Sequence, residues 1–510
     1  MMRSIAGVSC AVVLLALCAS SVAGAAAAAA NAAAGDTTGK SAKEAVAKPD
    51  QDLEPFPAAK SIHQAAVVAG KRLDYVVTVG SVTLKDAAGK TTGEVVYTAY
   101  TVPGATRPVT FSFNGGPGAA SVYLNLGALG PKKIEFGRDG DTASGSASLH
   151  DNPNSWLGFT DLVFIDPIGT GFSRSRVDEE QTKKNFLTAE ADIHYLSEVV
   201  YDWLVQNNRM TSRKYLIGES YGGYRVPRLA AHLQTEIGVG IAGITMVSPA
   251  LDPPALGAKD ALSPLRWAIN LPSMAAGYYE RQGKPLDDAS MAAVELYSRT
   301  EFVTDFLAGR SDKAATDRLV TKVAALTGLD PGFVRKLDGR VDVMSYLRES
   351  RRAEGRIGSF YDSNVTAFDP FPASAEPDSL DPILASSAPF EEAITQFVVG
   401  EVGWKVTARY YTNNFDLSRK FDRDDKDSPV TDLRKAMAVD PNMAVTIVNG
   451  WNDLACPYFA SRLVLAQLPD FGGSGRAKLH VYPGGHMFYA RPESAAAFRR
   501  DIKSTYSPAP

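Results

Sequence analysis

Short apolar runs alternate with helical patterns along much of this chain, and no other feature of the sequence limits its possible folds as strongly. Most of the runs are followed directly by Gly, Asn or Asp, and they cover residues 109–113, 162–165, 215–217, 244–247, 444–448 and 479–482. Helical patterns such as residues 189–205 and 224–234 lie between several of them. Strands that alternate with helices predict a mainly parallel sheet covered on both faces. The predicted fold class is therefore α/β.

Two regions depart from this alternation. Residues 75–79 and 95–100 are rich in β-branched and aromatic residues and are separated by a turn signature, which predicts antiparallel strands. From about residue 252 to residue 399 the chain reads mostly helical, with amphipathic stretches at 290–307 and 316–326. We expect a helical insertion at about 252–400 that forms a cap on the α/β core.

The overall composition excludes several classes of protein. The 510 residues are 45% hydrophobic, 22% charged and 9% aromatic, close to the averages of globular proteins, so disorder, coiled coil and collagen are excluded for the bulk of the chain. The net charge of -4 provides no basic field for nucleic acid. No metal-ligand cluster and no nucleotide-binding loop is evident, so the sequence implies neither a metal nor another cofactor. It does not determine an oligomeric state.

The first 60 residues do not read as part of the folded core. Residues 1–24 combine a positive charge at Arg3, an apolar stretch shorter than the ~20 residues of a membrane span, and a run of small residues, which predicts a secretory signal peptide. An uncleaved anchor is the alternative, but we expect export to the periplasm or the exterior without stable membrane insertion. Residues 25–60 are rich first in Ala and then in charge and Pro, as in a flexible leader. The folded α/β domain is predicted at 61–510.

The three cysteines are compatible with export. Cys10 and Cys18 lie in the predicted signal peptide and would be removed with it, which leaves Cys456. A single thiol cannot form a disulfide within the mature chain, so its stability must come from the size of its core. We expect Cys456 to pack as a small hydrophobic residue.

A nucleophile motif follows one of the predicted strands. Residues 218–222 match the pattern G-x-S-x-G between a strand and a helix, with Ser220 at its centre. In such a sharp turn the residues two positions before and after the serine must be nearly free of side chain, and the serine hydroxyl is pushed outward. A Gly-Ser turn without chemistry is the alternative interpretation.

A second glycine-rich segment, residues 114–118, follows the predicted strand 109–113. Glycines directly after a strand allow backbone N–H groups to point into a shared cavity as an oxyanion hole. Taken alone, the segment is equally compatible with an ordinary Gly/Pro loop.

The general base and its partner are expected downstream of Ser220, because α/β-hydrolases carry nucleophile, acid and base in that order along the chain. Of the six histidines, only His480 and His486 follow at sufficient distance. His480 lies within a predicted strand, whereas His486 lies in the loop after it, where catalytic groups gather in parallel sheets. Asp453 is the sole carboxylate in the loop after the preceding strand and could orient His486. Its alternative role is to cap a helix that starts near Pro457.

Taken together, these segments resemble the motif blocks of the serine carboxypeptidase family. The blocks occur in the family's order and are residues 114–118, 154–156, 166–173, 218–223, 449–453 and 485–487. The predicted helical insertion falls where that family carries its cap. The resemblance implies an α/β-hydrolase fold and the release of C-terminal amino acids from peptides with a free C-terminus, through an acyl-enzyme intermediate.

The resemblance also implies a role for each matched residue. Ser220 would be the nucleophile, His486 the general base and then acid, and Asp453 its orienting partner. The backbone N–H groups of Gly116 and Tyr221 would form the oxyanion hole.

The same resemblance implies a site for the carboxylate of the substrate. Asn114 and Glu219, helped by the backbone of Gly115, would hold the C-terminal carboxylate of the peptide. Because two adjacent carboxylates repel each other, Glu219 can bind this group only if the pair shares a proton. We therefore expect peptide release to work best at acidic pH.

Three positions depart from the family pattern. Ser112 stands where the family usually has Trp, Ala128 where a Glu supports the carboxylate-binding Glu, and Ala119 where a Cys is expected. Fewer side chains are therefore available to bind the substrate carboxylate than in the family pattern. An esterase or acyltransferase that uses the same triad is therefore an alternative function, and a non-catalytic binding protein on the same fold is a weaker one.

Overall fold

The computed structural model describes residues 53–104, 107–136, 147–251, 263–373, 381–385, 387–423, 428–471 and 475–506. These residues all lie within one unit, Ala45–Pro510. The predicted signal peptide and the predicted leader up to residue 52 lie outside the described residues.

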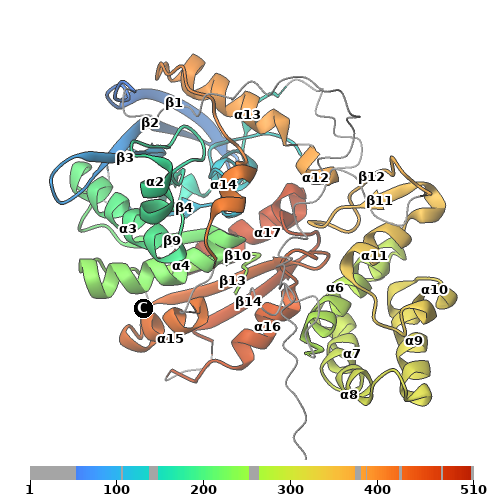
Figure 1. Ribbon diagram of the computed structural model, residues 1–510. Helices are drawn as coiled ribbons and strands as arrows, with labels where there is room; N and C mark the ends of the chain where they lie inside the picture. Colours follow the sequence, from blue (N-terminus) through green and yellow to red (C-terminus); the bar gives the residue numbers. More distant parts are fainter. Residues whose placement is uncertain are drawn as a thin grey trace, which may run out of the picture. The chain divides into compact units, whose positions relative to one another are not determined.

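A ten-stranded sheet forms the centre of this unit (Figure 1). Its order is β1-β2-β3-β7-β4-β9-β10-β13-β14, and β8 pairs with β3. The strands β7 to β14 along this path run parallel, whereas β1, β2 and β3 are antiparallel, which confirms the predicted α/β fold with a mainly parallel sheet. The strand bounds are β1 Lys60–Val68, β2 Lys71–Lys85, β3 Thr91–Thr101, β4 Val109–Phe113, β7 Asp161–Ile165, β8 Arg174–Ser175, β9 Lys214–Glu219, β10 Gly243–Val247, β13 Ala444–Gly450 and β14 Ala477–Tyr482.

Strand β4 shows why the parallel runs are apolar. It lies between β7 and β9, and all five of its residues are buried. Because side chains alternate along a strand, Phe111 and Phe113 enter the core on one face, whereas Thr110 points to the other. There the hydroxyl of Thr110 lies 2.8 Å from that of Thr160 and 2.9 Å from that of Tyr506.

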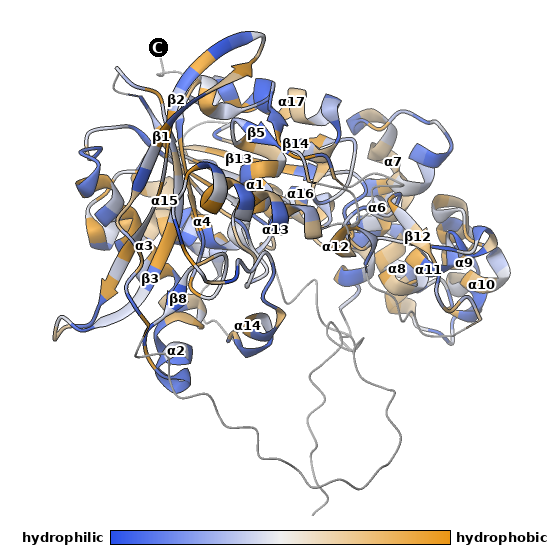
Figure 2. Ribbon diagram, turned by 90° about the horizontal axis from the view of Figure 1, so that it is seen from above, coloured by the Kyte–Doolittle hydropathy of each residue, from blue (hydrophilic) through white to orange (hydrophobic). Residues whose placement is uncertain are grey.

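Helices cover both faces of the sheet, and each face has its own hydrophobic cluster. Residues of α3, α4 and α15 build one cluster, and residues of α13 and α17 contribute to the other. Hydrophilic residues dominate the outlying helix α2 (Figure 2). The bounds are α1 Val122–Leu124, α2 Glu179–Phe186, α3 Ala189–Gln206, α4 Tyr221–His232, α12 Pro382–Ala385, α13 Ala388–Thr395, α14 Phe415–Lys420, α15 Pro429–Val439, α16 Tyr458–Ala466 and α17 Pro492–Lys503. Among the helices in the described part of the chain, none combines the length and apolarity that a bilayer crossing requires.

The segment between β10 and β13 contains a further group of helices with a hydrophobic cluster of its own. One long predicted helix is divided at Thr300 into α7 and α8. A short hairpin, β11 Arg356–Gly358 with β12 Thr366–Phe368, was not predicted, because three-residue strands give no periodic signal. The helix bounds are α6 Leu265–Arg281, α7 Asp288–Arg299, α8 Glu301–Ala308, α9 Lys313–Thr327, α10 Pro331–Lys336 and α11 Val343–Glu349.

Residues 53–59, which the composition assigned to the leader, make specific contacts. The ring of Phe56 lies 5.3 Å from that of Trp404, and the guanidinium of Arg174 stacks over Phe56 at 3.9 Å. The backbone N–H of Phe56 donates to Glu94 at 3.1 Å. Ordered packing therefore begins earlier than the predicted boundary at residue 60, because one aromatic residue anchors a segment that otherwise consists mainly of Pro and Ala.

Candidate active site

Ser220 occupies the sharp turn between β9 and α4. Its backbone has φ 60° and ψ -118°, a strained conformation for a residue with a side chain. Its N–H donates to the carbonyl of Val247 at 2.9 Å, which fixes the turn against the next strand. The flanking glycines are sterically required, since a Cβ on Gly218 would lie 2.0 Å from the carbonyl oxygen of Gly222, and one on Gly222 would lie 2.4 Å from that of Phe113. The predicted turn geometry is therefore present.

The second glycine-rich segment runs directly beside this turn. A Cβ on Gly115 would lie 2.5 Å from the backbone nitrogen of Tyr221 and 2.9 Å from the Cβ of Ser220. The next residue, Gly116, has φ 99°, which favours glycine. Within the part of the chain that the structure describes, the N–H groups of Gly116 and Tyr221 donate to no protein acceptor. The structure thus brings both predicted oxyanion donors close to Ser220.

His486 and Asp453 form a buried pair at the same edge of the sheet. Nδ1 of His486 lies 2.9 Å from Oδ2 of Asp453, and the carboxylate is fully enclosed. The second oxygen, Oδ1, accepts the backbone N–H groups of Ala455 and Cys456 at 2.9 Å each. The following helix, α16, begins after Pro457 without a side-chain cap. Asp453 therefore contacts His486 and does not act as the side-chain cap of this helix.

His486 is also held through its backbone. Its carbonyl accepts the hydroxyl of Ser248 at 2.9 Å, and its N–H donates to the carbonyl of Tyr361 at 2.6 Å. The ring of Tyr361 packs edge-on against the imidazole at 5.3 Å. Burial lowers the pKa of His486, but the charge and hydrogen bond of Asp453 and the charge of Glu219 outweigh it, so the pKa is raised above its usual value. The imidazole can therefore hold a proton with electrostatic support.

His480 and Cys456 lie in different surroundings. His480 lies on β14 with Nδ1 3.9 Å from Asp501, away from the pair formed by Asp453 and His486. Cys456 is buried, and its thiol hydrogen-bonds with Ser220. Burial raises the pKa of the Cys456 thiol well above its ordinary value, and the charge of Asp453 adds to this. It is therefore a neutral, packed thiol beside the serine.

Asn114 and Glu219 form a second buried pair, directly before Ser220 in the turn. Nδ2 of Asn114 donates to Oε2 of Glu219 at 2.6 Å, and Oδ1 of Asn114 accepts the N–H of Leu124 at 3.0 Å, which fixes the orientation of the amide. Burial raises the pKa of Glu219 to about 7, although the charge of His486 and the hydrogen bonds from Tyr489 and Asn114 act against it. This carboxyl can therefore carry a proton in mildly acidic solution.

Arg225 of α4 supports this pair through a buried ion pair. Its guanidinium is fully buried and pairs with Asp192 of α3, with Nε 2.6 Å from Oδ2. Another nitrogen, Nη1, donates to the carbonyl of Asn114 at 2.7 Å. The ion pair thereby fixes the start of the glycine-rich segment.

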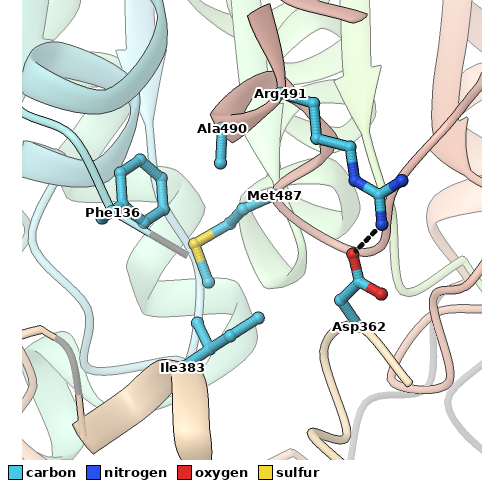
Figure 3. Close-up of a pocket in the computed structure, with 6 residues that line it drawn as sticks. All are labelled: Phe136, Asp362, Ile383, Met487, Ala490 and Arg491. Carbon is cyan, nitrogen blue, oxygen red and sulfur yellow. Dashed lines mark hydrogen bonds and ion pairs between the residues drawn. The ribbon is translucent and has the colours of Figure 1, made fainter. Parts of the chain in front are cut away.

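An ionic cluster contacts the two loops that carry Asp453 and His486. Arg491 contacts Asp362, at the hairpin of β11 and β12, and also Glu280 of α6. The amide of Asn452, the neighbour of Asp453, donates to Glu280. Figure 3 shows the ion pair of Arg491 and Asp362 at one side of a small pocket whose other lining side chains are apolar. These are Phe136, Ile383, Met487 and Ala490.

The contacts made by Tyr489 and Tyr361 were not found from the sequence. Tyr489 follows His486 by three residues, which places it one helical turn further along the chain. This spacing was the one sequence signal that Tyr489 lies near His486. No sequence signal indicates the contact of Tyr361, because this residue lies far from His486 in the chain and reaches it only through the fold.

Comparison with known proteins identifies similar sequences and structures. A family model described as serine carboxypeptidase matches residues 95–253, which include Asn114, Gly116 and Ser220 but neither Asp453 nor His486. Serine carboxypeptidase-like 50 from Arabidopsis thaliana is 29% identical over 293 residues, covering 55% of this chain and 59% of that protein. Serine carboxypeptidase-like 36 from the same plant is 33% identical over 155 residues, covering 29% of this chain and 30% of that protein. The chain thus spans less than two thirds of the length of these curated relatives.

One solved structure covers most of the described fold. It is the crystal structure of Kex1(Δ)p, a prohormone-processing carboxypeptidase from Saccharomyces cerevisiae, with a TM-score of 0.54 and 17% identity over 85% of this chain and 91% of that chain. At this identity the match concerns the fold. The resemblance of this chain to the serine carboxypeptidase family is therefore confirmed, and its fold is that of an α/β-hydrolase.

Proposed function

We propose that this protein is a serine-type carboxypeptidase that releases C-terminal amino acids from peptides. The observation that carries the proposal is the buried bond of 2.9 Å between His486 and Asp453 at the edge of the sheet where Ser220 occupies its strained turn. The buried pair of Asn114 and Glu219 beside the serine supports an exopeptidase over a general hydrolase.

In the acylation step, Nε2 of His486 takes the proton of the Ser220 hydroxyl while Oγ attacks the carbonyl of the last peptide bond. Asp453 keeps the proton on Nδ1 and stabilises the imidazolium that forms. The negative charge on the substrate oxygen is met by the N–H groups of Gly116 and Tyr221.

Acylation is completed when His486 gives this proton to the leaving amine, the peptide C–N bond breaks, and the free amino acid departs from the acyl-enzyme. A water molecule then gives its proton to His486 and attacks the acyl-enzyme on Ser220. His486 then returns this proton to Oγ of Ser220 as the ester bond breaks, which releases the shortened peptide and regenerates the serine.

The carboxylate of the substrate is held by the amide of Asn114, by the Gly115 backbone and by Glu219 in its protonated form. Because the pKa of Glu219 is raised to about 7, the proton needed for this contact is present at acidic pH and lost at alkaline pH. We therefore propose a preference for acidic conditions with free-acid peptides.

An esterase or acyltransferase is the second candidate, and Ala128 favours it. This residue is buried on the helical turn Asn125–Leu129, at the position where the family resemblance implies a supporting carboxyl group. An esterase would need the serine, Asp453 and His486 but not Glu219.

Two further parts of the proposal concern location and architecture. We propose export, on the basis of the charged start and apolar stretch of residues 1–24. We also propose that the inserted helices form a cap, since α6 packs against α16 and contributes Glu280 to the cluster behind His486.

The test uses N-blocked dipeptides with a free carboxylate, the matching amides and simple esters, at pH 5 and pH 7.5. We expect the wild-type protein, but not Ser220→Ala, to release amino acid from the free acids, best at pH 5, and to spare the amides. Ester hydrolysis without peptide cleavage would move the function to the second candidate. Equal activity of Ser220→Ala and wild type on every substrate would exclude catalysis by this serine.

A further inference from the structure

Tyr489 contacts Glu219 from the turn that follows His486. Its hydroxyl lies 2.8 Å from Oε2 and 3.0 Å from Oε1 of the carboxyl, and both side chains are buried. The ring of Tyr489 packs against the turn Asn125–Leu129, where a Cβ on Gly127 would lie 3.2 Å from it. Tyr489 thus lies between the glutamate and the turn that carries Ala128.

Asn114 and Tyr489 both donate hydrogen bonds to the carboxyl group of Glu219. The amide of Asn114 is oriented by Leu124, so that its NH₂ faces the carboxyl. Tyr489 keeps its proton, because burial raises its pKa well above 10 and the charge of Glu219 raises it further. Both neighbours therefore stabilise the carboxylate form and oppose the effect of burial.

Several other titratable groups also face Glu219 across the site. His486, from the loop after β14, supplies a positive charge when protonated, and Asp453, from the loop after β13, supplies a negative one. Tyr123 of α1 and the Cys456 thiol also interact with its charge. A direct hydrogen bond at 2.8 Å distinguishes Tyr489 from these four residues.

We propose that Tyr489 is a positioning residue that holds the Glu219 carboxyl in place and sets the upper limit of the pH range in which the site accepts a substrate carboxylate. This inference rests on the proposed carboxypeptidase function. Without the Tyr489 hydroxyl, the carboxylate form of Glu219 loses a donor, so its proton persists to higher pH. Binding of a free-acid peptide then extends into alkaline solution.

The kinetic test compares Tyr489→Phe with wild type between pH 5 and pH 9 on a free-acid dipeptide and on an ester that lacks the carboxylate. We expect the alkaline rise of KM for the free acid to move upward by about one pH unit, so that KM at pH 8 is about fivefold lower than in wild type. We expect kcat at pH 5 to change less than about twofold and the ester kinetics to be unaffected. The control is Tyr482→Phe, which removes a similar bond of 3.0 Å to Asp501, away from the Glu219 carboxyl, and should leave the profile unchanged.

A titration that needs no activity separates this inference from the proposed function. In protein labelled with ¹³C at the glutamate carboxyls, the Glu219 signal, assigned through Glu219→Gln, should titrate about one pH unit higher in Tyr489→Phe than in wild type. An unchanged midpoint in this titration would overturn the role of Tyr489. Failure of the wild type to cleave any free-acid peptide would instead overturn the proposed function, while the titration would still report on Tyr489.

Discussion

Arg491 and Asp362 form an ion pair of 2.8 Å that joins the segment after His486 to the hairpin of β11 and β12. The same arginine contacts Glu280 of α6, and Asn452 binds Glu280 from the loop that carries Asp453. The inserted helices are therefore attached to the two loops that carry Asp453 and His486. Their packing contributes to the geometry of the site.

Replacing Arg491 by Met should destabilise the protein, because Asp362 and Glu280 would be left close together without their shared cation. We expect the free energy of unfolding to fall by about 2 kcal/mol or more, measured by guanidinium denaturation. The control is Arg500→Met, which breaks a pair with Asp501 in which the arginine is largely exposed and should cost less than about 0.5 kcal/mol. Equal losses in the two variants would contradict a structural role for the cluster.

The strained backbone of Ser220 predicts an unusual order of stabilities. At φ 60° a glycine avoids the strain of a side chain, so Ser220→Gly should be more stable than Ser220→Ala by about 1 kcal/mol, even after the entropic cost of glycine in the unfolded chain. The order should reverse at Ser197, which lies within α3, where Gly is less stable than Ala by roughly 0.5–1 kcal/mol. Thermal unfolding of the four variants tests this, and the same order at both positions would argue against stored strain.

The raised pKa of Glu219 predicts how stability depends on pH. The folded state keeps this proton up to about pH 7, whereas the unfolded chain releases it near 4.5, so the folded state binds more protons in between and stability falls as pH rises. Wild type should lose on the order of 2–3 kcal/mol more than Glu219→Gln between pH 5 and pH 8. His486, whose pKa is also raised, adds a loss of the same sign to both proteins.

Denaturant unfolding at several pH values measures this difference. Glu190→Gln, an exposed position on α3, serves as the control and should follow the wild-type curve. Parallel curves for wild type and Glu219→Gln would mean that Glu219 is ionised at pH 5, and the proposed proton sharing with substrate would then fail.

The two C-terminal histidines should differ sharply in their effect on the reaction. His486→Ala removes the proposed general base and should lower kcat by about ten-thousand-fold or more. His480→Ala affects a partly exposed residue of β14 and should stay within about twofold of wild type. Steady-state kinetics on a good ester substrate decide between them, and a comparable loss from both variants would contradict the assignment of the base.

The glycine spacing and the loop positions allowed Ser220, Asp453 and His486 to be chosen from the sequence. A sharp turn needs glycines at fixed offsets, and loops after parallel strands gather at one edge of the sheet. The central strands were predicted for a similar reason, because buried strands must be apolar along their length.

What the sequence did not predict depends on contacts between distant segments. Glu280 meets Arg491 across 211 positions, and Arg225 reaches the carbonyl of Asn114 across 111. No local pattern encodes such a pair. Tyr361 reaches His486 only because the hairpin of β11 and β12 packs beside the catalytic loops, and neither of its three-residue strands has a recognisable period.

The most direct test of the central claim is covalent labelling with an organophosphonate fluoride, mapped by mass spectrometry. Such reagents capture a serine only when a neighbouring base activates it and an oxyanion hole receives the phosphonyl oxygen. We predict one adduct per chain, on Ser220, absent in Ser220→Ala and formed far more slowly in His486→Ala. Cleavage of peptides by a protein in which Ser220 stays unlabelled, or stoichiometric labelling at another residue, would contradict the account.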